Sequence, residues 1–227
     1  MSVDNLGIGV VFAIAALFLI WYLVGAMVNR RRIAAAARWV HRGLESYRDP
    51  HRGTSKASIK WLSTNAFSIL VEDARAPVGG VSATVLLQSR DMITVWLADL
   101  LSGRRDLLLL RYDFRRQPIW GVEIFRRRSI LAGDARRYAA QEGWSIEPSA
   151  DAELLTAHGG GKAGELCHEL LEALGGDRRH VIRLAVRRQA PHLTLAFDLP
   201  DPATADPAET IRLADRLARV VLGYSTR

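Results

Sequence analysis

The chain has 227 residues, a net charge of +7 and a sequence pI near 10.1. It is long enough for one sizeable core, and its single cysteine, Cys167, excludes an intramolecular disulfide and is typical of a reducing compartment. Residues 29–60 carry nine Lys or Arg and two acids, whereas the rest of the chain carries 22 of each sign. Because this basic segment follows an apolar run, an anionic lipid surface explains it more simply than nucleic acid does.

The apolar run, Leu6 to Val28, contains 23 residues without a charge. As a helix it would be about 34 Å long, enough to cross a hydrocarbon layer of about 30 Å. Asp4 precedes the run and the triplet Arg30 to Arg32 follows it, and positive residues stay on the cytoplasmic side of a membrane. We therefore expect the N-terminus outside and the rest of the chain in the cytoplasm. A cleavable signal peptide is the alternative, which the length of the run and the position of the arginines disfavour.

Residues 30–47 form the next expected element, an amphipathic helix. Apolar residues recur there at spacings of three and four, while arginines occupy the opposite side. Two arrangements stay open: a basic helix lying on the anionic leaflet, or a stalk whose apolar stripe packs on the domain or on a second copy. In the first arrangement the side chains that contact the lipid surface are Arg30, Arg31, Arg32, Arg38 and Arg42.

A short linker with Asp49-Pro50 follows this helix, so the chain divides into three parts. Residues 1–28 hold the N-terminal segment and transmembrane helix, residues 29–57 the basic juxtamembrane helix and linker, and residues 58–227 a cytoplasmic α+β domain.

The domain's pattern alternates between strands and helices. Strands are expected at residues 67–72, 81–87, 106–113, 119–125, 180–187 and 192–197, largely as hairpins. Helices are expected at residues 91–102, 134–142, 151–157, 162–174 and 208–222, and most of them precede a glycine that can end a helix. These elements predict a mainly antiparallel sheet covered on one side by helices.

Two stretches resemble motifs that carry chemistry, and both depart from the motif in detail. The glycine-rich run His158 to Gly164 precedes a helix, but Ala163 stands where a phosphate-binding Walker loop needs Ser or Thr. Glu165 and His168 have the Glu-x-x-His spacing of di-iron helices, yet the sequence has no second such pair. We expect a flexible connection and a solvated helix face, respectively.

The remaining candidates point to structure. The six histidines show no metal-ligand spacing, and Cys167 has no Lys or Arg one helical turn away that would activate its thiol. The triplet Arg126 to Arg128 fits a solvated end of a strand. No catalytic, cofactor-binding or metal-ligating residue is therefore predicted.

The sequence favours a single-pass, membrane-anchored cytoplasmic docking or scaffold module without enzymatic activity. Its expected partners are the lipid bilayer and a protein partner or second copy; nucleic acid is disfavoured, and no cofactor or small-molecule substrate is indicated. Two alternatives stay open: a membrane-tethered enzyme whose site is not visible from the sequence, and a binder of anionic lipid or nucleic acid that uses the basic segment.

Overall fold

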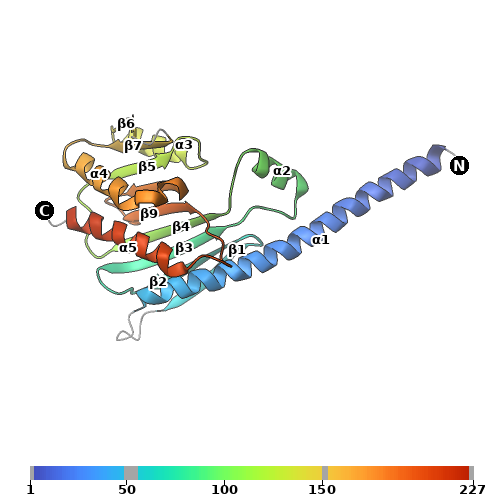
Figure 1. The fold of residues 1–227 in the computed structure, drawn as a ribbon, viewed down its shortest axis with the longest axis horizontal. Coiled ribbons are helices and arrows are strands. Elements are labelled where there is room, and N and C mark those ends of the chain that lie inside the picture. The colour runs from blue at the N-terminus through green and yellow to red at the C-terminus, as the bar shows by residue number, and fades with distance from the viewer. Residues whose placement is uncertain (1–2, 49–55, 150–152, 225–227) are drawn as a thin grey trace.

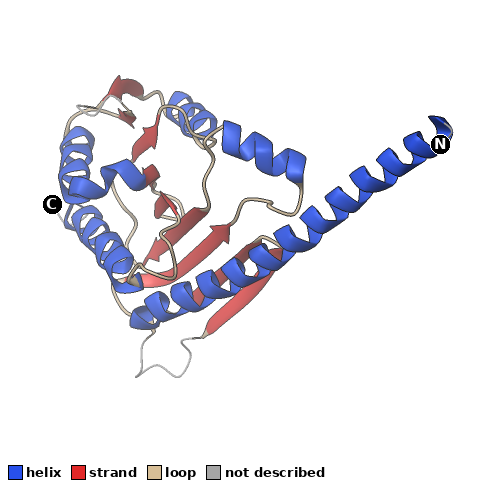
Figure 2. Cartoon of the chain, turned by 45° about the vertical axis from the view of Figure 1, so that its right-hand side comes forward, coloured by secondary structure: helices blue, strands red, loops and turns tan. Residues whose placement is uncertain are grey.

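A computed structural model of the chain describes residues 3–48, 56–149 and 153–224. Within them, one nine-stranded antiparallel sheet carries helices on its faces, and a long helix projects far beyond it (Figures 1 and 2). The expected α+β fold with a mainly antiparallel sheet is confirmed.

The strands are β1 (Ala57–Ser63), β2 (Ala66–Glu72), β3 (Val78–Leu86), β4 (Leu107–Phe114), β5 (Val122–Arg126), β6 (Ser145–Pro148), β7 (Leu154–His158), β8 (Val181–Val186) and β9 (Leu193–Asp198). The α-helices are α1 (Val3–Leu44), α2 (Ile93–Leu101), α3 (Ala132–Gln141), α4 (Lys162–Leu174) and α5 (Pro207–Tyr224), and the short 3-10 helices are η1 (Glu45–Tyr47) and η2 (Gly175–His180).

The order of strands in the sheet is β1-β2-β3-β4-β9-β8-β5-β7-β6. β2 and β3 form the expected hairpin, in which Ile69 lies opposite Ala83. β4 and β5 follow each other in the chain but are separated in the sheet by β9 and β8. The last two strands therefore join the two halves of the molecule into one continuous sheet.

Helices cover both faces of the sheet, not one face as expected. The second half of α1, together with α4 and α5, packs over the larger core, to which Ile124 of β5 belongs. Phe125 points to the opposite face, because successive residues of a strand alternate, and it packs against Ala135 and Ala139 of α3.

Three strands differ from the sequence-based expectation. Residues 151–157 were expected to be helical, but Leu154–His158 is strand β7; residues 151 and 152 lie outside the described residues. Almost all of β7 is buried between β5 and β6, so it lacks the polar and apolar alternation that marks a half-buried strand. The edge strands β1 and β6 were not expected at all, and the linker expected at 49–55 lies outside the described residues.

The helix α1 runs unbroken from Val3 to Leu44 (Figure 1). Among the described residues it is the one helix long and apolar enough to cross a membrane. Apart from the partly buried Trp21, its large apolar side chains between Ile8 and Val28 are exposed, whereas Ile33, Val40 and Leu44 are buried in the core. Of the two arrangements left open for residues 30–47, the structure shows the apolar stripe packed on the domain.

Candidate functional site

β1 forms an open edge of the sheet. One side of it pairs with β2, from Ala57 opposite Val71 to Ser63 opposite Ala66, and its other side has no strand partner among the described residues. Three large apolar side chains stand exposed on this strand, Ile59 by 46%, Trp61 by 58% and Leu62 by 50%. An exposed, apolar edge strand is a template for pairing with another chain, and native proteins normally protect such edges.

A hollow of about 580 Å³ separates β1 from α1. It is lined by Ala37, Arg38, His41 and Arg42 of α1 and by Ile59 of β1. Both arginines are exposed, and the imidazole of His41 lies 3.5 Å from the carboxylate of Glu45 one turn further along the helix. The open edge is thus flanked by a groove with an apolar floor and a basic rim, which we call the β1 groove.

The other edge of the sheet is protected in the ways expected of an edge that does not pair. β6 has only four residues, and it carries Glu147 and Pro148. A short strand with a charge and a proline offers little backbone to an incoming chain. Among the described residues, β1, with seven residues and one charged side chain, Lys60, is the longer and less protected of the two edges.

The basic residues predicted to contact lipid fall into two groups. Arg38 and Arg42 line the β1 groove, whereas Arg30 to Arg32 lie at the foot of the exposed half of α1. Arg30 and Arg31 are exposed to solvent. Arg32 is half-exposed and its Nη2 lies 3.1 Å from Oδ2 of Asp106 on the domain.

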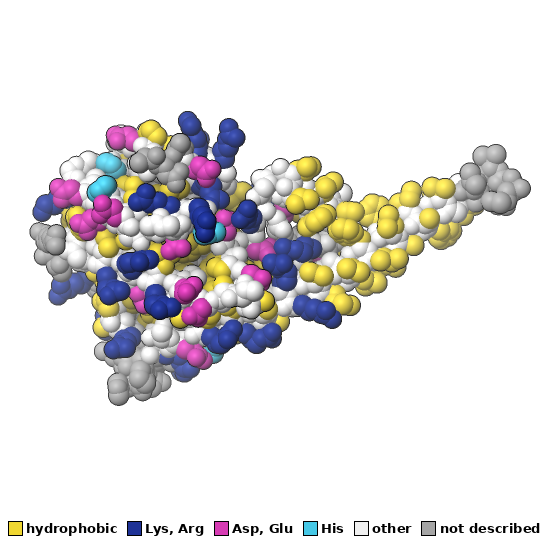
Figure 3. Space-filling view, viewed as in Figure 1, with side chains coloured by type: hydrophobic (Ala, Val, Ile, Leu, Met, Phe, Trp, Pro, Cys, Tyr) yellow, Lys and Arg dark blue, Asp and Glu magenta, His cyan; other side chains and the backbone are white. Residues whose placement is uncertain are grey.

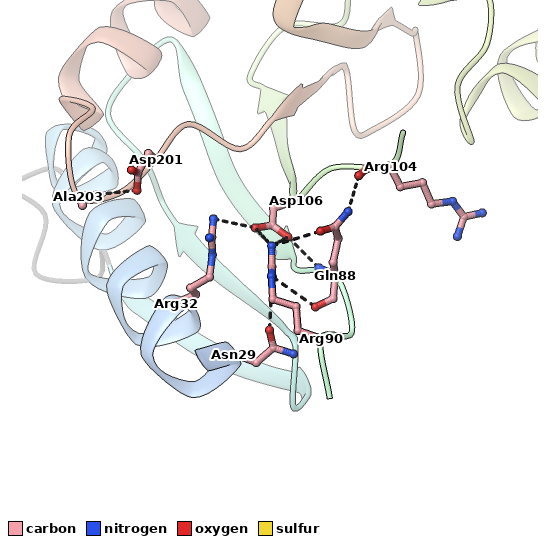
Figure 4. Close-up of polar contacts among 8 residues, drawn as sticks. All are labelled: Asn29, Arg32, Gln88, Arg90, Arg104, Asp106, Asp201 and Ala203. Atoms are coloured by element: carbon pink, nitrogen blue, oxygen red, sulfur yellow. Dashed lines mark hydrogen bonds and ion pairs between the residues drawn. The ribbon is translucent and has the colours of Figure 1, made fainter. Parts of the chain in front are cut away.

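Asp106 is the centre of a polar cluster at this foot of α1 (Figure 4). It is buried, and Arg90 donates to both its carboxylate oxygens at 3.2 and 3.1 Å. Arg90 also reaches Asn29 of α1, Nη1 to Oδ1, at 3.4 Å, and the backbone N–H of Gln88 donates to Asp106 at 2.8 Å. The cluster ties the loops at the ends of β3 and β4 to the point where α1 enters the domain.

The two motif-like stretches have structural surroundings. In the glycine-rich connection between β7 and α4, Gly160 and Gly161 take positive φ angles, and the N–H of Gly160 donates to Nδ1 of His158 at 3.2 Å. On α4, His168 pairs with Glu172 at 3.3 Å, and both side chains are mostly exposed. Among the described residues, no group of three or more His, Cys, Asp or Glu is arranged to hold a metal ion.

Cys167 and Arg126 also have structural surroundings. Burial raises the pKa of the Cys167 thiol to about 12, with a smaller effect from the charge of Glu147, so the thiol is not activated. Arg126 donates to the carbonyl of Arg179 at 2.6 Å and lies 3.6 Å from Asp198.

Another hollow, of about 820 Å³, lies between the end of β9 and α5. Three of its acids are paired with arginines: Asp198 with Arg126, Asp206 with Arg212 at 3.8 Å, and Asp177 with Arg216 at 4.0 Å. Two further acids line the hollow, Asp201, which accepts from the N–H of Ala203, and Glu209. The pairing of these three acids with arginines is typical of a solvated surface.

Sequence reasoning missed two buried polar networks. In the first, Arg183 of β8 donates two hydrogen bonds of 2.8 Å to the fully buried carboxylate of Glu123, and Arg187 donates two more, of 3.2 and 2.7 Å. Burial alone would lower the pKa of Arg183, but the hydrogen bonds and charges of Glu123 and Asp134 together outweigh it and raise the pKa. The alternation of Glu123 and Arg183 with apolar neighbours would place both side chains on a solvated face, so no local pattern marks this buried pair.

The second network joins η1, directly after α1, to the sheet and α5. The Tyr47 hydroxyl donates to Asp215 and lies 3.0 Å from the hydroxyl of Tyr112. Burial, reinforced by Tyr112 and Asp215, raises the pKa of Tyr47, so its hydroxyl stays protonated and can donate. The network fixes the end of the helical part of the chain to the domain; it depends on contacts far apart in sequence, which no local pattern reveals.

No protein-family model matches the chain, and no curated protein matches it.

Proposed function

We propose that the protein is a single-pass, membrane-anchored docking module without enzymatic activity, whose β1 groove binds an extended, acidic and apolar segment of a partner protein at the cytoplasmic face of the membrane. The open edge of β1, with its exposed Ile59 and Trp61 beside Arg38 and Arg42, carries this proposal.

The binding mode is strand addition. An extended peptide can add to a free sheet edge through its backbone, while pockets for alternate side chains supply specificity. Here the free edge of β1 would pair with the backbone of the peptide, and the apolar floor formed by Ile59 and Ala37 would receive its side chains. Arg38 and Arg42 on the rim favour acidic side chains in the bound segment and disfavour basic ones.

The packing of α1 supports a retained anchor over a cleaved signal. Trp21 and Gly25, inside the apolar run, contact the loop that contains Arg90: the Trp21 indole N–H donates to the Arg90 carbonyl at 3.0 Å. The same helix then continues into the core. Cleavage within or after the run would remove contacts that belong to the folded domain, and the arginines after the run favour a cytoplasmic domain.

Lipid contact is proposed for Arg30, Arg31 and Arg32 at the inner leaflet. Along α1, Arg38 lies about 9 Å and Arg42 about 15 Å beyond Arg32, both more than the screening length of about 8 Å at physiological salt. In this proposal Arg38 and Arg42 serve the β1 groove instead.

Site-specific photo-crosslinking in the cells that produce the protein tests the docking proposal. A photo-reactive amino acid replaces Ile59 at the open edge or, as a matched control, Ile146 at the protected edge, since both side chains are partly exposed. Position 59 should give a discrete adduct that position 146 does not give. The double variant R38E/R42E, which changes two exposed side chains, should abolish the adduct without lowering the melting temperature.

Two results would contradict the proposal. One is an adduct of equal yield from both positions, or none from either. The other is an adduct with the mass of two copies of this chain, which would indicate self-association rather than an acidic partner.

A further inference from the structure

The short helix α2 exposes an unusual amount of apolar surface. Its sequence is ITVWLADLL, and the exposed large side chains at or beside it are Met92, Val95, Leu97, Leu100 and Leu101, the last by 81%. Its one ionisable residue, Asp99, is largely buried and pairs with Arg104 at 3.3 Å. Contiguous exposed apolar surface of this kind marks an interaction site.

Contacts between α2 and α1 show where α2 lies along the axis of α1. The ring of Trp96 in α2 packs on the ring of Trp21 in α1, with centroids 5.3 Å apart. At Gly25 the backbone of Arg90 comes so close that a Cβ atom would lie 2.2 Å from the Arg90 carbonyl oxygen. α2 therefore lies beside the last part of the apolar run, not beside the segment of α1 that packs on the sheet.

This level is within the membrane if α1 crosses one. Trp21 lies seven residues before Val28, which corresponds to about 10 Å along the helix axis, whereas the hydrocarbon of one leaflet is about 15 Å thick. The indole N–H of Trp21 donates to the backbone carbonyl of Arg90, in the loop before α2, and so has the acceptor that it needs where no water is present.

The figures agree with this placement. Figures 1 and 2 show α2 clear of the sheet and next to α1, with its axis crossing that of α1 rather than following it. In Figure 3 the hydrophobic side chains of α1 continue onto α2, and Lys and Arg side chains begin where α1 reaches the sheet. The cluster around Asp106 and Arg90 marks the same boundary.

We infer that α2 is a second membrane-contacting element: its apolar side chains lie among the lipid acyl chains of the leaflet nearer the domain. A helix that lies in a leaflet with one apolar face is a known mode of membrane attachment. Because the apolar surface of α2 continues that of the span, we take lipid to be what covers it. Two contacts with the bilayer, α1 and α2, would fix the rotation of the domain about the membrane normal and hence the direction in which β1 faces.

A fluorescent label that reports lipid contact tests the inference on the full-length protein. In a C167A background, single cysteines replace Leu101 on α2, Val24 in the span and Ile130 on the domain, all exposed side chains. Each is labelled with an environment-sensitive dye, and the protein is reconstituted in vesicles whose lipids carry bromine on the acyl chains. Bromine quenches only dyes that touch the chains.

The label at position 101 should be quenched as strongly as the label at position 24, and the label at position 130 should not be quenched. Quenching at 24 without quenching at 101 would overturn the inference and leave the anchor intact. A label at 101 that is shielded from both water and bromine would also overturn it, because a second copy or another protein would then cover α2. No quenching at 24 would overturn the span and, with it, this inference, which rests on α1 crossing the membrane.

Discussion

The two halves of α1 have the same secondary structure but opposite surroundings. Between Gly7 and Val28 the helix is apolar and most of its side chains are exposed, apart from the contacts of Trp21 and Gly25 with the Arg90 loop and α2, whereas after Asn29 the apolar residues form one stripe that is buried against the sheet and α5. A helix that is apolar all round requires an apolar solvent, and one with a single stripe requires a protein core. Because no break separates the halves, a segment apolar enough to cross a membrane and a core element form one continuous helix.

This difference predicts which N-terminal truncations leave a folded domain. A fragment of residues 29–227 keeps the buried stripe, which includes Ile33, Trp39 and Leu44, and should unfold cooperatively with heat. A fragment from Ser58 lacks the stripe and exposes the core beneath it, so it should be insoluble or lack a cooperative transition. Residues 58–227 were expected from the sequence to form a domain alone; that prediction stays open, and the packing of α1 argues against it. Two fragments with equal melting temperatures would show that the stripe is dispensable.

The same contrast holds for single aromatic residues. Trp39 is 2% exposed and donates its indole N–H to the Ala205 carbonyl at 2.8 Å, whereas Phe18 lies exposed in the apolar half. W39A should cost about 3–5 kcal/mol of unfolding free energy, as expected for a large buried aromatic residue. F18A should leave the unfolding of the domain unchanged. Denaturant titration of both full-length variants in the same detergent measures the difference.

Two glycines in the apolar half of α1, Gly25 and Gly9, have different surroundings. A side chain at Gly25 meets the Arg90 backbone, whereas nothing lies within 4 Å of a Cβ atom at Gly9. G25V should separate the Arg90 loop and α2 from α1 at a cost of about 1–3 kcal/mol, the usual penalty for overpacking. Hydrogen exchange of residues 88–102 should rise in G25V and stay as in the wild type in G9V. Equal exchange in the two variants would mean that the close contact does not hold the loop.

The smallest expected effect concerns lipid contact at the foot of α1. With the fragment of residues 29–227, R30Q/R31Q should weaken binding to anionic vesicles by about 1 kcal/mol per arginine, and added salt should weaken the wild type in the same direction. R38Q/R42Q is the matched control and should bind nearly as the wild type does. Equal losses from both pairs would assign lipid contact to the whole basic segment.

Local patterns in the sequence predicted much of the fold but little of its assembly. The span, the amphipathic segment, α2 and six of the strands have apolar residues at helical or alternating spacing, and such spacing is visible in a single sequence. β7 was taken for a helix because it is buried on both faces and its sequence, LLTAH, has no alternation. Its pairing with β5, Ile124 opposite Thr156, decides the outcome, and that contact joins distant parts of the chain.

The candidate site shows the same limit. Arg38 and Arg42 were recognisable as basic residues on the polar face of a helix, but their position beside Ile59 follows from the return of the chain as β1. Ile59 and Trp61 do alternate with polar residues, yet both point to the core side of an edge strand and remain exposed, so their role depends on where β1 lies in the sheet. The depth of α2 likewise depends on the contact of Trp96 with Trp21, 75 positions earlier in the chain by their residue numbers.

The most direct test of the account is the side of the membrane on which the domain lies. In a C167A background, a cysteine at Ser2 and a cysteine at the exposed Ile130 are treated in intact cells with a thiol reagent that does not cross membranes. A membrane-anchored cytoplasmic module predicts labelling at position 2 and none at position 130 until the cells are opened. Labelling at position 130 in intact cells would place the domain outside, and would contradict both the cytoplasmic docking module and the inner-leaflet role of Arg30 to Arg32.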